Sequence, residues 1–352
     1  MTALGPVRLC RSYARCPACG QGAFPADGLL GLDGWLTPRA LRMACRAGAA
    51  DPFRKAEALL GELAGWSVDA DTLRRRRHEQ AARAAAGRAA RTGLPEAFAR
   101  AAGDHELHID AGKVNTVEDR WRDVKVAVFA RRERGEPSDA AGLERRRLPP
   151  PSVRSVVAAV EGRQAFGPRV EAEALRLRVP LGEGLSVLGD GAGWIWGLAE
   201  DHFHGAAQAL DVWHAVENMA QAGRAALGAG EELQAWPRRS KGELVGDGYA
   251  GACAALGSLT AVAGASPQAC AAAAEALNYF AAHRGRLGYA ARLRRGRSVG
   301  SGLVEGSIKQ LLNLRMKRTG ARWRVAGVGP FVESVALADS PGWDEYWMAL
   351  AA

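Results

Sequence analysis

Residues 107–112 (LHIDAG) and 186–191 (SVLGDG) decide the fold that this sequence predicts. In each stretch a short apolar run ends in an aspartate, Asp110 or Asp190, and small residues follow it. A short apolar run is typical of a buried strand, and open α/β sheets hold ligands beyond the ends of such strands. The two stretches therefore predict an α/β fold with two carboxylates at one edge of its sheet.

Alternating hydrophobicity extends this sheet on either side of the two aspartates. Residues 106–114 and 121–133 indicate two strands joined by a turn. Residues 185–200 predict a third strand and a turn, 206–227 a short strand that runs into a helix, and 153–175 a helical stretch. We expect one inward face on the first two strands, supplied by Leu107, Ile109, Val124, Val126 and Val128.

The region before the sheet, residues 29–103, has a helical period. Gly65 stands where a helix should end, and the residues after it resemble the turn and second helix of a helix-turn-helix. Val68 is the expected apolar anchor of that turn, and Asp69 or Asp71 the expected cap of the second helix. That helix opens with four consecutive arginines, Arg74, Arg75, Arg76 and Arg77.

Positive charge is concentrated in two segments of a chain whose formal net charge is +9. Residues 71–100 hold eight arginines and three acids, and residues 284–324 hold twelve basic residues and one acid, Glu305. Clustered charge of this kind favours phosphate contact with nucleic acid, although solvated helix faces are the alternative. The predicted DNA contacts are Arg74, Arg75, Arg76, Arg77, Lys309, Arg315, Lys317, Arg318 and Arg322.

Glu305 is a lone carboxylate in the second basic segment, where it would repel DNA unless a cation lay between them. Together with Asp110 and Asp190 it could bind two Mg²⁺ or Mn²⁺ ions, an arrangement that supports in-line attack at phosphorus. The alternative is that Glu305 only pairs with Lys309, one helical turn later.

Four blocks of the sequence, residues 7–32, 108–132, 189–219 and 277–323, resemble the insertion-sequence transposases of the Kra group, which are relatives of the Mutator-like DDE transposases. The resemblance implies an α/β, ribonuclease-H-like mixed-sheet core with an all-α insertion. It also implies that the catalytic and metal-binding acids are Asp110, Asp190 and Glu305. The D-x-x-H motif of these relatives matches Asp211 and His214. On chemistry alone, that histidine could act at the site or form a structural pair with Asp211.

A C-x-x-C pair, Cys16 and Cys19, is half of a zinc site, since structural zinc needs four ligands. The related transposases carry a second pair upstream that this sequence does not contain, so zinc binding at Cys16 and Cys19 stays open.

These patterns predict a partial zinc-ribbon-like segment at residues 1–28 and a helical DNA-binding region at residues 29–103. The first part of the core covers residues 104–217, and a helical insertion covers residues 218–295. The second part of the core, with the Glu-bearing helix, covers residues 296–340, and a tail covers residues 341–352.

The expected function is a DNA transposase that cleaves and transfers strands at the terminal inverted repeats of an insertion sequence. We expect it to act as a homo-oligomer on repeat and target DNA, in the bacterial cytoplasm at the nucleoid, without a membrane partner, because no apolar run of bilayer length is present. Two alternatives remain: an inactive, domesticated or truncated copy that represses by binding DNA, and a ribonuclease-H-like nuclease.

Overall fold

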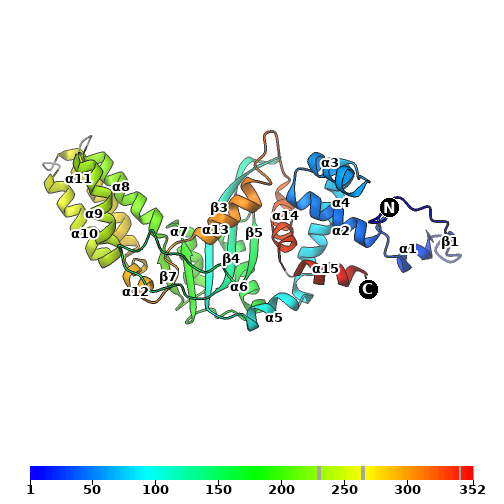
Figure 1. The fold of residues 1–352 in the computed structure, drawn as a ribbon, viewed down its shortest axis with the longest axis horizontal. Helices are drawn as coiled ribbons and strands as arrows, with labels where there is room; N and C mark the ends of the chain where they lie inside the picture. The colour runs from blue at the N-terminus through cyan, green and yellow to red at the C-terminus, as the bar shows by residue number, and fades with distance from the viewer. Residues whose placement is uncertain (228–230, 263–265, 341, 352) are drawn as a thin grey trace.

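The computed structural model describes residues 1–227, 231–262, 266–340 and 342–351. Helical regions lie at either end of a central mixed sheet (Figure 1). The expected α/β class is confirmed. Within the described residues, no helix combines the length and the apolar character that a bilayer span requires.

The central sheet has five strands among the described residues, in the order β5–β4–β3–β6–β7. Strands β3, β4 and β5 are antiparallel, whereas β6 and β7 run parallel to β3. Their bounds are β3 (Asp104–Thr116), β4 (Arg120–Arg132), β5 (Val153–Ala159), β6 (Leu185–Gly189) and β7 (Ala207–Leu210).

Both faces of the sheet are buried, which corrects the expectation of one inward face. Leu107 and Ile109 of β3 lie in the apolar cluster under α6 (Arg163–Leu177) and α7 (Gly193–His202). The predicted partner valines of β4 lie in the opposite cluster, under α13 (Gly302–Ile308) and α14 (Val325–Ala338): Val124, Val126 and Val128. Helices on both faces explain why β4 reads as an almost continuous apolar run.

Two elements differ from the predicted ones. Residues 153–175, expected as a helical stretch, begin with the strand β5 and become helical only at α6. Residues 185–200, expected as a strand and turn, form β6 only as far as Gly189 and then the helix α7. Trp196 of that helix is buried in the core, and Trp194 packs against the same cluster.

The N-terminal region is helical, as expected. Gly65 ends α3 in the left-handed conformation (φ 70°), Val68 is buried, and Asp69 caps α4 by accepting a hydrogen bond from the backbone N–H of Thr72 at 2.9 Å. The helices are α1 (Pro25–Leu29), α2 (Pro38–Ala50), α3 (Phe53–Ala64), α4 (Ala70–Ala86) and α5 (Gly93–Arg100).

The C-terminal residues expected as a tail form a helix, α15 (Gly342–Ala351). Three aromatic side chains of this helix are buried in the cluster that also contains residues of α2 and α3, which are Trp343, Tyr346 and Trp347. Burial of this aromatic surface is the physical reason that the segment folds back onto the N-terminal helices.

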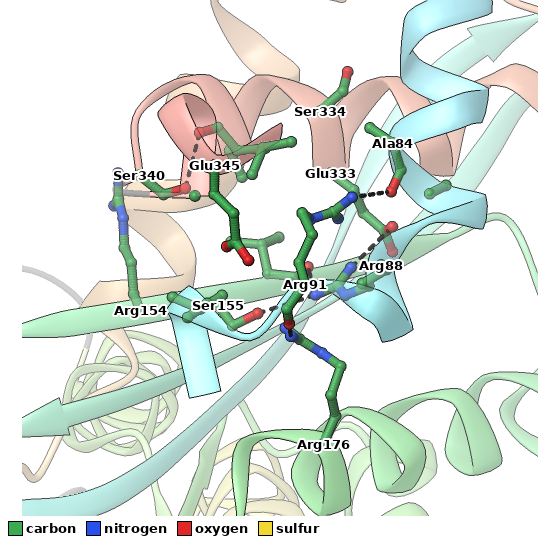
Figure 2. Close-up of a pocket in the computed structure, with 16 residues that line it drawn as sticks. Ala84, Arg88, Arg91, Arg154, Ser155, Arg176, Glu333, Ser334, Ser340 and Glu345 are labelled. Atoms are coloured by element: carbon green, nitrogen blue, oxygen red, sulfur yellow. Dashed lines mark hydrogen bonds and ion pairs between the residues drawn. The ribbon is translucent and has the colours of Figure 1, made fainter. Parts of the chain in front are cut away.

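A buried ion-pair network joins the N-terminal helices to the sheet. Arg88, which follows α4, donates hydrogen bonds to Glu173 of α6 and to the hydroxyl of Ser155 on β5, and forms an ion pair of 2.9 Å with Glu333 of α14. Figure 2 shows Arg88 between Ser155 and Glu333, with the side chain of Arg176 reaching the backbone carbonyl of Arg91. Burial alone would raise the pKa of Glu173, but its hydrogen bonds and ion pairs with Arg176 and Arg88 lower this pKa to about 2.

The insertion between β7 and α13 consists of helices joined by short connections in its described residues. This agrees with the helical insertion predicted for residues 218–295. It forms a bundle at the end of the molecule opposite to the N-terminal helices (Figure 1). Its helices are α8 (Val212–Leu227), α9 (Glu231–Asp247), α10 (Tyr249–Val262), α11 (Pro267–Ala282) and α12 (Tyr289–Arg294).

Candidate active site

Three aspartates lie at the same level of three neighbouring strands, β3, β6 and β7. The register pairs Ile109 of β3 with Gly189 of β6, and Gly189 with Leu210 of β7. The next residue along each strand is an aspartate: Asp110, Asp190 or Asp211. Because residues in register share a level of the sheet, this arrangement brings together the two predicted strand-borne acids and adds Asp211 as a third.

The third predicted acid, Glu305, comes from α13, which packs on β3 and β4. A glycine of β3 permits the close approach: a Cβ atom at Gly112 would lie 2.6 Å from Leu312 and 2.9 Å from Ile308. Asp110 pairs with Val126, and this valine belongs to the cluster under α13. Asp110 therefore lies on the face of the sheet that the Glu305 helix covers.

Asp190 and Glu305 lie close enough to Asp110 for their charges to act on its carboxyl group, although among the described residues these three acids are not a group whose ligand atoms all lie within 4.8 Å of one another. Burial, followed by the negative charges of Asp190 and Glu305, raises the pKa of Asp110 to about 6, against the lowering effects of a backbone hydrogen bond from Ala111 and of the charge of His214. Like charges at short range disfavour ionisation of one another, so this cluster favours a neighbouring cation. Glu305 makes no ion pair with Lys309 among the described residues, and its side chain is exposed.

Asp211 connects β7 to the segment that precedes α13. One carboxylate oxygen accepts hydrogen bonds from the backbone N–H groups of Trp213 (2.7 Å) and His214 (2.9 Å). The other accepts from both the N–H and the hydroxyl of Ser301. The Ser301 hydroxyl also lies 2.9 Å from a carboxylate oxygen of Glu305.

His214 is the cationic group nearest to these acids. Its Nδ1 lies 3.3 Å from Asp211, and the hydrogen bond with Asp211, reinforced by the charges of Asp190 and Glu305, raises its pKa to about 9 against the effect of burial. Ligand atoms of Asp211, His214 and Glu305 all lie within 4.8 Å of one another, which makes this trio a candidate metal group.

Asp211 is nonetheless better suited to positioning than to binding an ion. It is completely buried, and both of its oxygens already accept hydrogen bonds. Asp110 and Asp190 are partly exposed, and each accepts a single backbone hydrogen bond, from Ala111 at 2.6 Å and from Ala192 at 3.0 Å. The carboxylates with capacity left for a metal ion are therefore Asp110, Asp190 and Glu305.

The helical insertion also reaches this site, which the sequence analysis missed. A Cβ atom at Gly191, whose φ is +105°, would lie 2.7 Å from the Tyr279 hydroxyl and 3.5 Å from Nε2 of His283. Burial and the charges of Asp190 and Asp211 raise the pKa of Tyr279 to about 12. Its hydroxyl is buried without a hydrogen-bond partner within the described part of the chain. The one signal for these residues in the sequence is their position inside the 277–323 block.

Two predicted DNA contacts are wrong, because their side chains are buried. Arg77 is 1% exposed and lies over the ring of Phe331, and Arg315 is 4% exposed and donates to the backbone carbonyl of Gly48. Arg76 is half-buried and its charge is balanced, since it pairs with Asp33 at 2.7 Å and with Glu79 at 3.0 Å. The remaining candidates are exposed: Arg74, Arg75, Lys309, Lys317, Arg318 and Arg322.

Cys16 and Cys19 lie in an exposed turn between two short strands, β1 (Ala14–Arg15) and β2 (Gly22–Ala23). Backbone and side-chain hydrogen bonds from Cys19, with one from Ala18, lower the pKa of Cys16. Within the described residues, no further histidine, cysteine or acid joins them in a metal-binding group. The geometry thus gives zinc two ligands instead of four.

Comparison of the chain with models of protein families and with curated proteins found no match.

Proposed function

We propose that the chain is a DNA transposase with a ribonuclease-H-like core, in which Asp110, Asp190 and Glu305 form the catalytic centre. The observation that carries this proposal is that two acids in register on neighbouring strands and one acid on a helix packed over β3, all far apart in the sequence, are near enough for the charges of two of them to act on Asp110. The sheet supports it, because three antiparallel strands followed by two parallel ones agree with the mixed sheet that the resemblance implies.

The chemistry of the donors fits divalent metal ions. Carboxylate oxygens are hard ligands that suit Mg²⁺ and Mn²⁺. The raised pKa of Asp110 reflects its burial first and then the negative charges of Asp190 and Glu305, and a cation would offset both. The residues to hold two such ions are Asp110, Asp190 and Glu305. When bound, the ions would lower the pKa of an attacking water or 3′-hydroxyl and stabilise charge on the leaving oxygen.

His214 and Asp211 complete the site as a phosphate-binding pair. Asp211 holds Nδ1 of the imidazole, so the protonated ring keeps its Nε2–H group for another acceptor. A phosphate oxygen of DNA is the acceptor that the basic surroundings favour, because residues 284–324 hold twelve basic residues. His214 would then orient the DNA, and Asp211 would orient His214.

DNA cleavage tests the proposal directly. The substrate is a supercoiled plasmid that carries both ends of the DNA segment encoding the chain, incubated with Mg²⁺ or Mn²⁺. We expect metal-dependent cleavage and strand transfer at those ends, lost in Asp110→Asn and in Glu305→Gln, with DNA binding kept. Asp123→Asn is the control, because Asp123 is an exposed acid on the neighbouring strand β4. Strand transfer that survives in both active-site variants would refute the assignment.

The same assay distinguishes the alternatives. Salt-sensitive DNA binding without metal-dependent nicking would identify a non-catalytic repressor, a function that the exposed arginines could serve without the acids. Cleavage at positions unrelated to the ends of the DNA segment would identify a nuclease. We further propose that the chain acts on DNA in the cytoplasm as a homo-oligomer, since two ends must be joined to one target.

A further inference from the structure

A groove of about 880 Å³ lies between the N-terminal helices and the segment that follows the Glu305 helix. Helix α4 forms one wall, and residues 315–330 form the other. Phe53 at the start of α3 and Val117 in the turn between β3 and β4 complete the lining. The volume is within the range of about 300–1,000 Å³ that is typical of small-ligand sites.

The floor of the groove is aromatic, and the buried guanidinium of Arg315 lies over two of its rings, 4.6 Å from that of Phe53 and 5.7 Å from that of Trp323. The ring of His78 lies 5.7 Å from that of Trp323 and 6.3 Å from that of Phe53, and Trp323 lies 4.7 Å from Phe331. Burial, followed by the charges of Arg74, Arg77 and Arg315, lowers the pKa of His78 to about 4. At neutral pH this imidazole therefore adds a neutral ring to the floor.

The rim of the groove is cationic. Four arginines of the lining have no carboxylate partner among the described residues: Arg75, Arg318, Arg322 and Arg324. Arg74 has one exposed partner, Asp71, at 3.3 Å. Glu79 is the acid in the lining, and Arg76 already pairs with it. The groove thus combines unbalanced positive charge at its edge with a floor of aromatic rings.

We propose that this groove binds an unpaired strand of DNA, with a base on the aromatic floor and the flanking phosphates on the arginine rim. Single strands offer both features at once, because every base has a π face and every linkage has a negative charge. A duplex would bring phosphates to the rim but would keep its bases stacked and away from a recessed floor. Acidic peptides would satisfy the charge without using the rings.

The position of the groove relates it to the proposed catalytic centre without making it part of that centre. The segment that carries Glu305 in α13 continues through a π-helical turn (Lys309–Asn313) to the groove-lining residues that begin at Arg315. Strand binding here needs neither metal ions nor cleavage, so it extends beyond the transposase proposal.

Fluorescence anisotropy of the full chain with a fluorescein-labelled 20-mer of thymidylate, in the presence of a chelator, tests the rim. We expect the double variant Arg318→Ala/Arg322→Ala to weaken binding about tenfold or more at moderate salt. Its matched control is Arg39→Ala/Arg238→Ala, which removes the same charge from exposed positions on α2 and α9 and should change binding less than about twofold.

Photo-crosslinking with the same oligonucleotide bearing 5-iodouracil tests the floor, and we expect the modified peptides to contain His78 or Trp323. His78→Leu should weaken binding of the single strand several-fold and leave binding of a blunt duplex unchanged. The proposal is overturned if both double variants lose affinity equally, if crosslinks map outside the groove, or if duplex binding falls as much as single-strand binding. Because this binding is measured in a chelator, where no cleavage occurs, the result is separate from the test of catalysis.

Discussion

Asp211 accepts hydrogen bonds from both the backbone N–H and the hydroxyl of Ser301, although 90 residues separate the two. These residues stand at the two ends of the helical insertion, since α8 begins directly after Asp211 and α13 begins directly after Ser301. These hydrogen bonds therefore hold the two ends of the insertion together. Glu305 lies one helical turn after Ser301, so its position depends on the contact between Ser301 and Asp211 and not on the length of the insertion.

Replacement of Ser301 by alanine should disturb both stability and ion binding. The variant keeps the backbone N–H that reaches Asp211 but loses the hydroxyl shared by Asp211 and Glu305. We expect a loss of about 1–2 kcal/mol in the free energy of unfolding, because a buried carboxylate loses a donor. Affinity for Mn²⁺, measured by isothermal titration calorimetry, should fall as well.

Ser307→Ala is the matched control for this prediction. Ser307 is also buried, lies on the same helix as Glu305 and donates to the backbone carbonyl of Leu303. This variant should lose stability without losing Mn²⁺ affinity. Equal Mn²⁺ affinities for the two variants would mean that the Ser301 hydroxyl does not position Glu305.

Gly112→Ala should push the Glu305 helix away from the sheet. The added methyl group would meet side chains of Leu312 and Ile308 at less than 3 Å. We expect a cost of about 1–3 kcal/mol in urea unfolding, which is the usual penalty of overpacking, together with weaker Mn²⁺ binding. Gly306→Ala on the same helix meets no atom within 4 Å and should stabilise the protein by up to about 1 kcal/mol. A Gly112→Ala variant as stable as the original would contradict the packing.

The strands that carry the site could be predicted from the sequence, because each combines a clear apolar pattern with an aspartate at its end. The strand β5 could not, since an apolar run of this length fits a helix as well as a strand. Helix α7 falls in residues 185–200, for which the sequence predicted a strand and a turn, and its contacts with the core are what identify it as a helix.

The buried arginines mark a second limit of the sequence. A count of charges does not tell which arginines of a helix face water. The buried face of α4 includes Leu73, Arg77, Ala81 and Ala84. Arg77 lies on that face four residues after Leu73, so spacing alone could have raised the suspicion of burial. The roles of Tyr279 and Ser301 depend on contacts between distant segments, which no local pattern encodes.

Stability should fall in acid because of the network around Glu173. The folded pKa of about 2 lies below the ordinary value of 4.5, so the ionised form stabilises the fold above pH 4.5. This contribution should disappear as the pH falls from about 5 towards 2. Glu173→Gln should cost about 3 kcal/mol at pH 7, since Arg88 loses a buried partner, and should flatten the acid dependence measured by urea unfolding.

The exposed pair of Arg100 and Glu96, 3.6 Å apart, provides the control for that experiment. Glu96→Gln should change the free energy of unfolding by less than about 1 kcal/mol at any pH, because water screens the pair. If the acid dependence is the same in Glu173→Gln as in the original protein, another carboxylate causes it.

Tyr279→Phe should separate activity from stability. The Tyr279 hydroxyl is buried beside the Asp190 turn without a partner, so its removal breaks no hydrogen bond in the free protein and should leave stability unchanged or higher. We expect this hydroxyl to gain a hydrogen-bond partner beside Asp190 when the site is occupied, and the loss of one such bond should slow cleavage about tenfold. Tyr289→Phe removes an unpaired hydroxyl that is completely buried and out of reach of DNA, so its cleavage rate should stay normal. Equal rates in Tyr279→Phe and the original protein would show that the insertion only covers the site, whereas a slow but stable variant would show that it contributes a group to the reaction.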